Sequence, residues 1–141
     1  MMLSQEQADR LIAMLKEAAR QTVFTWEQDQ RQNEAVVAVE DERLQFVLSL
    51  KRNPFEIRLH FRTRDRDVGL VRVDNNPYHA NPDGTEIRNQ PHLHIYREGY
   101  DKLEWAEPID WYDVRSPVGT LDRFLEIIHA RFTFGYQLSL L

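Results

Sequence analysis

The 141-residue sequence contains no cysteine, which excludes disulfide bonds, thiolate metal sites and a cysteine nucleophile. It also lacks an apolar run of the roughly 18 to 20 residues that a membrane-spanning helix requires, and it does not begin with a basic segment followed by an apolar one. We therefore expect no membrane association and a cytoplasmic location. Glycine-rich nucleotide-binding signatures, H-E-x-x-H and G-x-S-x-G are missing as well.

Charge is distributed unevenly along the chain. The formal net charge of −5 argues against a protein that coats nucleic acid through overall positive charge. Between Arg43 and Arg72, however, there are eight basic and three acidic residues, so this segment carries +5 and the rest of the chain −10. Such a basic surface suits an anion such as RNA or a small phosphorylated ligand, although solvent-exposed strands with salt bridges are the simpler explanation.

Hydrophobic patterning predicts a single α+β domain over residues 1–141, with a helix near each end. Ser4 and Gln7 are spaced as a capping box, and apolar residues recur at helical spacing from there to Ala19. Ser116 and Pro117 are typical of the start of a C-terminal helix. Alternating patterns between the helices predict a mainly antiparallel meander of about five strands, at residues 34–40, 43–52, 55–62, 70–74 and 92–96.

The segment 55–62 gives the clearest strand pattern, since Phe55, Ile57, Leu59 and Phe61 alternate with polar residues. After the fourth strand, residues 75–91 are rich in Asn, Pro, Asp and Gly, which predicts a long ordered loop. Long loops in compact domains are often functional.

Titratable side chains gather around this loop. His79, His92, His94, Asp74 and Tyr96 lie within one short stretch, and the spacing His92-Leu-His94 places both imidazoles on one face of a strand, with Tyr96 following on that face. Two imidazoles in unequal environments can supply a general base and a general acid near neutral pH without a cofactor. We therefore assign catalysis to these five residues and expect neither a metal ion nor another cofactor.

Arginines on the neighbouring strands could support such chemistry. Arg58, His60, Arg62 and Arg72 are the candidate anion-binding residues, because they alternate onto the polar face of the sheet. In metal-free RNA cleavage one histidine takes the proton of the 2′-hydroxyl, another protonates the leaving 5′-oxygen, and a cation stabilises the charge on the phosphate. The strand register decides whether these groups meet.

Two other interpretations of the H-x-H pair stay open. The histidines could form a ladder whose hydrogen bonds are satisfied by Asp74, Glu98 or backbone carbonyls. They could also hold a metal ion, in which case the third ligand would be Asp74, His79 or Glu98.

The segment 74–108 resembles an uncharacterised family from phages, prophages and bacterial mobile elements, whose members carry D..P.H.NPDG, then HLHIY and (K)WA. Glu104 stands here in place of the usual Lys. DNNPYH and PHLH are more weakly similar to TumE-type toxins of toxin–antitoxin pairs, with Tyr78 replacing the first histidine of a paired PHH. The second resemblance implies functional roles for Asp74, His79, His92 and His94, and an antitoxin as partner.

The sequence thus leads to one expected function and two alternatives. We expect a small intracellular protein of a phage, prophage or mobile element, toxin-like, acting on RNA or another phosphate ester through the histidines with arginine support. The first alternative is a non-enzymatic phage or prophage protein that binds a host defence protein or sequesters a small anionic ligand. The second is a structural homo-oligomer.

Overall fold

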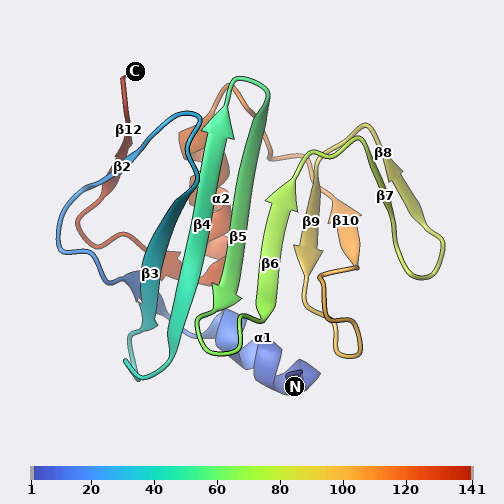
Figure 1. The fold of residues 1–141 in the computed structure, drawn as a ribbon, viewed down its shortest axis with the longest axis horizontal. Coiled ribbons are helices and arrows are strands. Elements are labelled where there is room, and N and C mark those ends of the chain that lie inside the picture. The colour runs from blue at the N-terminus through green and yellow to red at the C-terminus, as the bar shows by residue number, and fades with distance from the viewer. Residues whose placement is uncertain (1, 141) are drawn as a thin grey trace.

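The computed structural model describes residues 2–140 and shows a large sheet with α1 (Gln5–Ala13) and α2 (Pro117–Ile128) packed against it (Figure 1). This confirms the α+β class. The strands are β1 (Lys16–Ala18), β2 (Phe24–Trp26), β3 (Gln32–Ala38), β4 (Gln45–Asn53), β5 (Glu56–Thr63), β6 (Gly69–Asp74), β7 (Tyr78–Ala80), β8 (Glu86–Arg88), β9 (His92–Ile95), β10 (Ala106–Pro108), β11 (Ala130–Arg131) and β12 (Tyr136–Leu138). None of the helices in residues 2–140 has the length and apolar character needed to cross a membrane.

The main sheet is larger than the predicted meander. It has eight strands in the order β10-β9-β6-β5-β4-β3-β1-β11, and every pair is antiparallel except β1 with β11. The five predicted strands correspond to β3, β4, β5, β6 and β9 and form its centre in the expected order. The remaining strands form two separate pairs, a parallel β2–β12 pair and an antiparallel β7–β8 hairpin.

Strand β5 shows how the alternating pattern produces the two faces of the sheet. Ile57, Leu59 and Phe61 are fully buried, whereas the residues between them face the opposite side. Phe55 does not follow this pattern and is 83% exposed. It lies in the turn before β5, where the Asn53 side chain accepts hydrogen bonds from the backbone N–H groups of Phe55 and Glu56.

The N-terminal helix begins as predicted but is shorter. Gln7 N–H donates to the Ser4 hydroxyl and Ser4 N–H donates to the Gln7 side chain, which is the expected capping box. The helix ends at Ala13, and the apolar residues from there to Ala19 belong instead to β1 and to the chain on either side of it. At the C-terminus, α2 begins at Pro117 as predicted, and the following apolar tail contributes β12.

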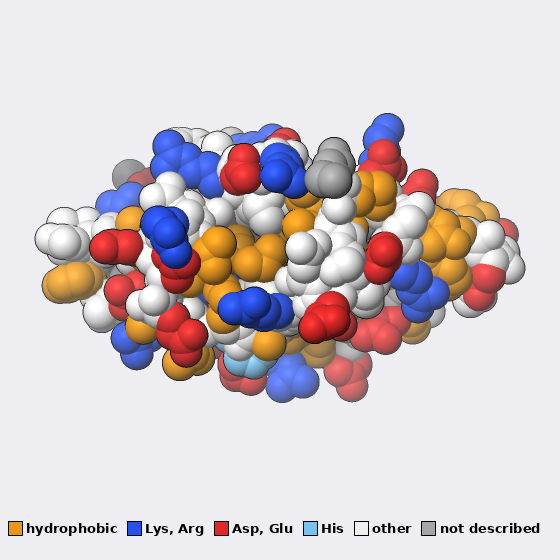
Figure 2. Space-filling model, turned by 90° about the horizontal axis from the view of Figure 1, so that it is seen from below, with side chains coloured by type: hydrophobic (Ala, Val, Ile, Leu, Met, Phe, Trp, Pro, Cys, Tyr) orange, Lys and Arg blue, Asp and Glu red, His pale blue; other side chains and the backbone are white. Residues whose placement is uncertain are grey.

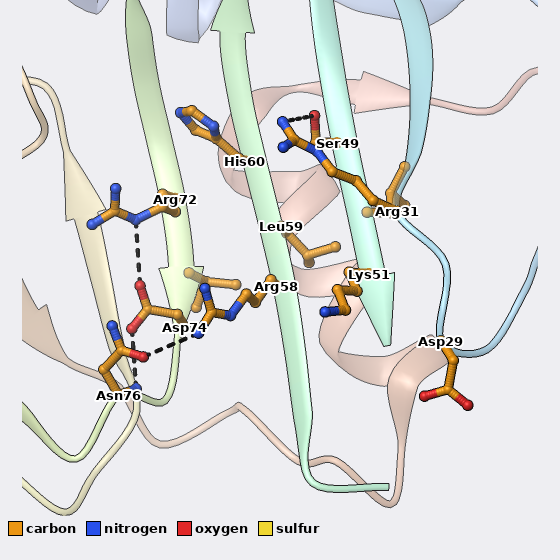
Figure 3. Close-up of a pocket in the computed structure, with 12 residues that line it drawn as sticks. Asp29, Arg31, Ser49, Lys51, Arg58, Leu59, His60, Arg72, Asp74 and Asn76 are labelled. Carbon is orange, nitrogen blue, oxygen red and sulfur yellow. Dashed lines mark hydrogen bonds and ion pairs between the residues drawn. The ribbon is translucent and has the colours of Figure 1, made fainter. Parts of the chain in front are cut away.

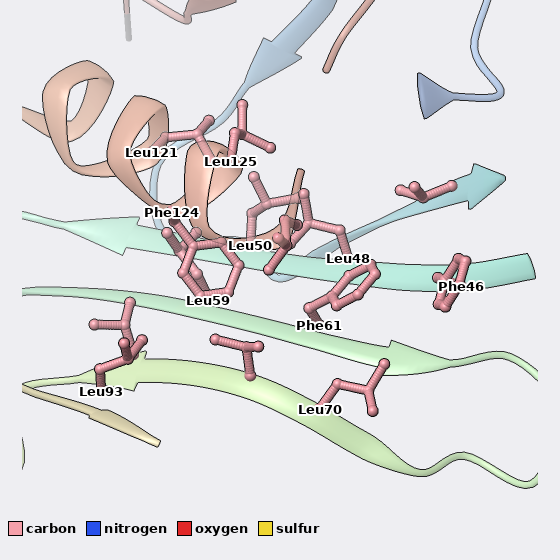
Figure 4. Packing of buried hydrophobic residues seen from close by; sticks show 14 of the residues in the cluster. Phe46, Leu48, Leu50, Leu59, Phe61, Leu70, Leu93, Leu121, Phe124 and Leu125 are labelled. Atoms are coloured by element: carbon pink, nitrogen blue, oxygen red, sulfur yellow. The ribbon is translucent and has the colours of Figure 1, made fainter. Parts of the chain in front are cut away.

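The hydrophobic core lies between the sheet and α2. Leu121, Phe124 and Leu125 of α2 pack toward Leu50 of β4 and Leu59 of β5 (Figure 4). Both helices lie on this side, which leaves the polar side chains of the central strands on the opposite face. The end of the molecule seen in Figure 2 carries acidic and basic side chains side by side, with hydrophobic atoms between them.

The predicted loop at residues 75–91 contains the β7–β8 hairpin (Figure 1). Asn81 at the end of β7 fastens this hairpin to β10, since its side chain donates to the Ala106 carbonyl (3.0 Å) and accepts from the Ala106 N–H (2.9 Å). The hairpin thereby brings His79 to the edge of the sheet where β6, β9 and β10 lie.

Candidate functional site

The register between β6 and β9 creates the centre of the site. Asp74 pairs with His92 and Arg72 pairs with His94, so all four side chains extend from the face opposite the helices. Alternation over residues 71–74 of β6 and 92–94 of β9 keeps the hydrophobic residues Val73 and Leu93 on the core side. The sequence therefore places these polar groups together through ordinary strand pairing.

His79 from β7 completes a compact group of imidazoles. Its ring centroid lies 5.4 Å from that of His92 and 4.9 Å from that of His94, and the last two are 4.9 Å apart. One ring nitrogen from each histidine lies within 4.8 Å of the others. We call His79, His92, His94 and Asp74 the histidine cluster.

Asp74 connects the two histidines of β9. Its Oδ1 lies 3.0 Å from His92 Nε2, and its Oδ2 lies 3.5 Å from His94 Nε2. Arg72 Nε lies 3.3 Å from Oδ2, and one terminal nitrogen of the same guanidinium lies 3.3 Å and 3.4 Å from the two ring nitrogens of His94. A carboxylate, two imidazoles and a guanidinium thus form one contiguous network.

Backbone oxygens face each imidazole as well. His92 Nδ1–H donates to the Gln90 carbonyl (3.2 Å), and His94 Nδ1–H donates to the Leu103 carbonyl (2.7 Å). His79 Nε2–H is placed to donate to the Glu104 carbonyl and to the Asn81 side-chain oxygen, each at 2.9 Å. Leu103 has a positive φ of 53°, an uncommon conformation for a bulky residue, so its carbonyl is aimed at His94 at some cost in backbone strain.

The cluster is withdrawn from solvent, and this changes its electrostatics. His92 and His94 are each 1% exposed and Asp74 is 3% exposed, while His79 is half-buried. Burial lowers the pKa of His92. Burial opposes ionisation of Asp74, but hydrogen bonds from His94 and the Asn76 N–H, together with both neighbouring imidazoles, hold the pKa of Asp74 below its usual range.

Tyr96, the fifth residue assigned to catalysis from the sequence, does not join this cluster. Strand β9 ends at Ile95, so the alternation that would place Tyr96 beside His94 stops one residue earlier. Its ring is buried in the hydrophobic core, and its hydroxyl donates to the Leu3 carbonyl before α1. Tyr96 fastens the N-terminal segment to the sheet.

A pocket of about 560 Å³ lies on the polar face beside the cluster (Figure 3). Three of the four candidate anion-binding residues, Arg58, His60 and Arg72, line it. Arg62 does not, and its guanidinium pairs with Asp67 (2.7 Å) and Ser49 (2.6 Å). We call this the basic pocket; its lining also includes Asp29, Arg31, Ser49, Leu50, Lys51, Leu59, Val73, Asp74 and Asn76.

The charge in the basic pocket affects His60. Burial lowers the pKa of His60 to about 4, and the nearby guanidinium groups of Arg62, Arg72 and Arg31 add to this effect. His60 is therefore neutral at pH 7, and the positive charge of the pocket comes from its arginines and Lys51.

A second, shallower pocket of about 410 Å³ reaches the cluster from the hairpin side. Arg72, His79, Lys102 and Glu104 are among its lining residues. Arg72 lines both pockets, and the cluster contributes Asp74 to the basic pocket and His79 to the second one. Arg72 and the cluster thus lie between two solvent-accessible hollows.

Sequence reasoning missed three residues that shape this region. Lys51 could have been found, because it alternates with Ser49 on the polar face and pairs in register with Arg58. Arg31 precedes β3 and carries no comparable signal. Asn81 belongs to the NPDG turn, where its type suggests only turn formation, yet its side chain fixes both the hairpin and the His79 ring.

The arrangement offers two kinds of chemistry. The nitrogen-rich cluster can exchange protons or hold a metal ion, since imidazole and carboxylate groups serve both purposes. The basic pocket can bind an anion such as a phosphate group.

Comparison with known proteins gives a family but no described activity. No match was found among curated proteins, and none was found among solved structures. A family model described as a family of unknown function (DUF6978) matches residues 3–130, which include both helices, the histidine cluster and the basic pocket. The chain belongs to the DUF6978 family.

Proposed function

We propose that this protein acts on RNA or another phosphate ester, which it binds in the basic pocket and cleaves at the histidine cluster. The observation that carries the proposal is the position of Arg72, which contacts Asp74 and His94 and also lines both pockets. A phosphate bound by this guanidinium lies next to the imidazoles. We further propose that the protein is an intracellular, toxin-like product of a phage, prophage or mobile element, with an antitoxin as partner.

The basic pocket supports the binding step. Arg31, Lys51, Arg58 and Arg72 come from four different segments and surround one hollow. Arg58 is held by Glu56 (3.0 Å) and Asn76 (3.3 Å), so its orientation is set before a ligand arrives. Guanidinium groups bind phosphate in bidentate geometry, which gives orientation as well as affinity.

The histidine cluster supports the chemical step. His79 is the cluster histidine with solvent access, and it lines the second pocket together with Arg72. A substrate that extends from the basic pocket past Arg72 therefore meets this imidazole. His92, His94 and Asp74 are enclosed and hold the region together through their shared contacts. Arg72 stabilises charge that develops on the phosphate.

A second candidate function is sequestration of a small anionic ligand without turnover. The burial of His92 and His94 favours it, because imidazoles 1% exposed reach a bulky substrate only after a conformational change. In that case the basic pocket alone carries the function, and replacing arginines weakens binding more than replacing histidines.

Expression in a bacterial host, with total RNA examined in parallel, tests the proposal. The wild-type chain should arrest growth and deplete RNA, whereas His79→Ala and the His92→Ala/His94→Ala double variant should do neither. His129→Asn is the matched control, because His129 caps the C-terminus of α2 in a left-handed conformation that Asn tolerates, away from the cluster. Circular dichroism establishes that each variant is folded.

The outcomes separate the two candidates. Growth arrest and RNA loss that depend on His79 support cleavage. Absence of toxicity, or toxicity that the histidine substitutions leave unchanged, overturns it. If Arg58→Ala then lowers the affinity for a fluorescent oligonucleotide or inorganic phosphate while His79→Ala does not, the sequestration function is supported instead.

A further inference from the structure

The three histidines carry an inference that does not depend on the proposed activity. They come from two different strands, β7 and β9, and one ring nitrogen from each histidine lies within 4.8 Å of the others. Asp74 adds a carboxylate 3.0 Å from one of the rings. Three imidazoles and a carboxylate in one place form a ligand set suited to a divalent transition metal.

Both ring nitrogens of His92 and both ring nitrogens of His94 face oxygen atoms. His92 faces the Gln90 carbonyl with Nδ1 and the Asp74 carboxylate with Nε2, and His94 faces the Leu103 carbonyl with Nδ1 and the same carboxylate with Nε2. A neutral imidazole has only one N–H, so it can satisfy one of these oxygens and must turn a lone pair toward the other. A metal ion bound at the second nitrogen of each ring would relieve this conflict.

Each of the three histidines also makes a hydrogen bond of the kind that orients metal-binding histidines. In metal sites the ring nitrogen that does not bind the metal donates to a carbonyl or carboxylate, which fixes the orientation of the ring. Each of the three rings has such an oxygen at 2.7 to 3.2 Å. The same nitrogen of His79 also contacts the Asn81 side-chain oxygen. The Asn81 amide is held in one orientation by its two hydrogen bonds with the Ala106 backbone, which further fixes the His79 ring.

We propose that His79, His92 and His94 bind one divalent transition metal ion of the zinc type, each through one ring nitrogen, with Asp74 balancing part of its charge. Zinc–nitrogen bonds of about 2.0–2.1 Å place the nitrogens of tetrahedral ligands roughly 3.3 Å apart. The three ring nitrogens here are separated by up to 4.8 Å. Metal binding therefore draws the rings together, and the hairpin that carries His79 closes toward β9.

The positive charge of Arg72 is the main opposing feature. Its guanidinium contacts Asp74 and lies close to both nitrogens of His94, so it competes with a metal ion for the same negative charge. The near-equal distances of 3.3 and 3.4 Å to the two ring nitrogens place the guanidinium over the ring and not along one lone pair. Replacing Arg72 by Gln should accordingly tighten metal binding.

Titration of the purified 141-residue chain with Zn²⁺ and Co²⁺, after EDTA treatment and removal of the chelator, tests this site. We expect one ion per chain by calorimetry, visible absorption from bound Co²⁺, and a higher melting temperature with Zn²⁺. His79→Gln should weaken binding by at least about 100-fold, since loss of outer-shell partners alone costs 10- to 100-fold. His129→Asn should bind as the wild type does.

Two results would overturn the metal site: no binding at micromolar Zn²⁺, or equal binding by the wild type and His79→Gln. His79→Gln is chosen over substitutions of His92 or His94 because its half-buried position makes misfolding less of a concern. The titration contains no substrate, so it tests the metal site separately from the proposed activity. A protein that binds zinc but does not cleave RNA supports the metal site and contradicts the proposed function. A protein that cleaves RNA but does not bind zinc contradicts only the metal site.

Discussion

At the scale of single residues, Asp74 is the most constrained side chain of the site. It is buried, carries a negative charge and contacts His92, His94, Arg72 and the Asn76 N–H. A buried carboxylate stabilises the fold only while its charged and hydrogen-bonding partners are present. Removing the carboxylate in turn leaves those partners buried without a counter-charge.

Replacing Asp74 by Asn should therefore destabilise the fold by about 2–4 kcal/mol, because the amide removes the charge that Arg72 and the imidazoles face. Urea denaturation measures the change, and Asp101→Asn, in an exposed turn, is the matched control. A loss below about 0.5 kcal/mol would show that the network contributes little to stability.

His60 gives a prediction about pH. The folded protein binds a proton at His60 only near pH 4, whereas an unfolded histidine binds one near pH 6.5. Between these values the unfolded state holds more protons, so His60 lowers stability as the pH falls from 6.5 to 4. The urea midpoint of His60→Gln should decline less than that of the wild type over this range. Parallel declines would contradict the shifted pKa.

At the scale of elements, Lys16 joins the ends of both helices. Its buried ammonium donates to the carbonyls of Ile12 and Met14 at the end of α1 (2.9 and 2.7 Å) and to that of Ile128 at the end of α2 (2.7 Å). Unpaired carbonyls at helix C-termini attract cations. One side chain of β1 thus fixes both helices to the sheet.

Lys16→Met should cost about 2–4 kcal/mol, because Met fills a similar volume but leaves three carbonyls without this donor. Thermal and urea unfolding of the variant measure the loss, with the exposed Lys102→Met as control. An unchanged melting temperature would mean that solvent replaces Lys16 at these carbonyls.

The β7–β8 hairpin is the second element with its own prediction. Asn81 links it to β10 through two hydrogen bonds with Ala106 and also contacts His79. Asn81→Ala should release the hairpin, so that backbone amides at residues 78–88 exchange with deuterium faster while those of β4 and β5 keep their protection. Hydrogen exchange followed by mass spectrometry distinguishes this local effect from global unfolding, in which all regions would accelerate together.

At the scale of the whole molecule, the central strands could be predicted and the peripheral ones could not. Strands β3, β4, β5, β6 and β9 follow an alternating pattern because one face packs on α2. Strands β1, β10 and β11 have only two or three residues each, too few for a period to show. Their pairing is determined by distant partners, such as His129, whose carbonyl accepts from Lys16 N–H.

The arrangement of the candidate site could also be predicted from the sequence only in part. The shared face of Asp74, His92 and His94 follows from strand periodicity and was predicted. The sequence also groups His79 with these residues, but the contact of its ring with the other two depends on how the hairpin folds over the sheet edge, which strand periodicity does not encode. Tyr96 was placed on the wrong side because the end of β9 at Ile95 is set by tertiary contacts.

If the protein binds RNA as proposed, the basic pocket predicts how the affinity depends on salt. If about three phosphates contact the basic pocket, the logarithm of affinity should fall with the logarithm of salt concentration with a slope near −2, since single strands lose about 0.7 per contact. Fluorescence anisotropy of a labelled oligonucleotide between 50 and 200 mM salt measures it, and Arg58→Ala should make the slope shallower. A slope near zero would exclude phosphate contacts as the source of affinity.

The strands at the two ends of the main sheet limit how this molecule can associate with copies of itself. Strand β10 spans three residues and ends in Pro108, which has no N–H to offer, and β11 spans two residues. Exposed sheet edges are templates for aggregation, and short edges or edges with proline oppose it. Fibril-like growth by strand addition is therefore disfavoured at both ends of the main sheet.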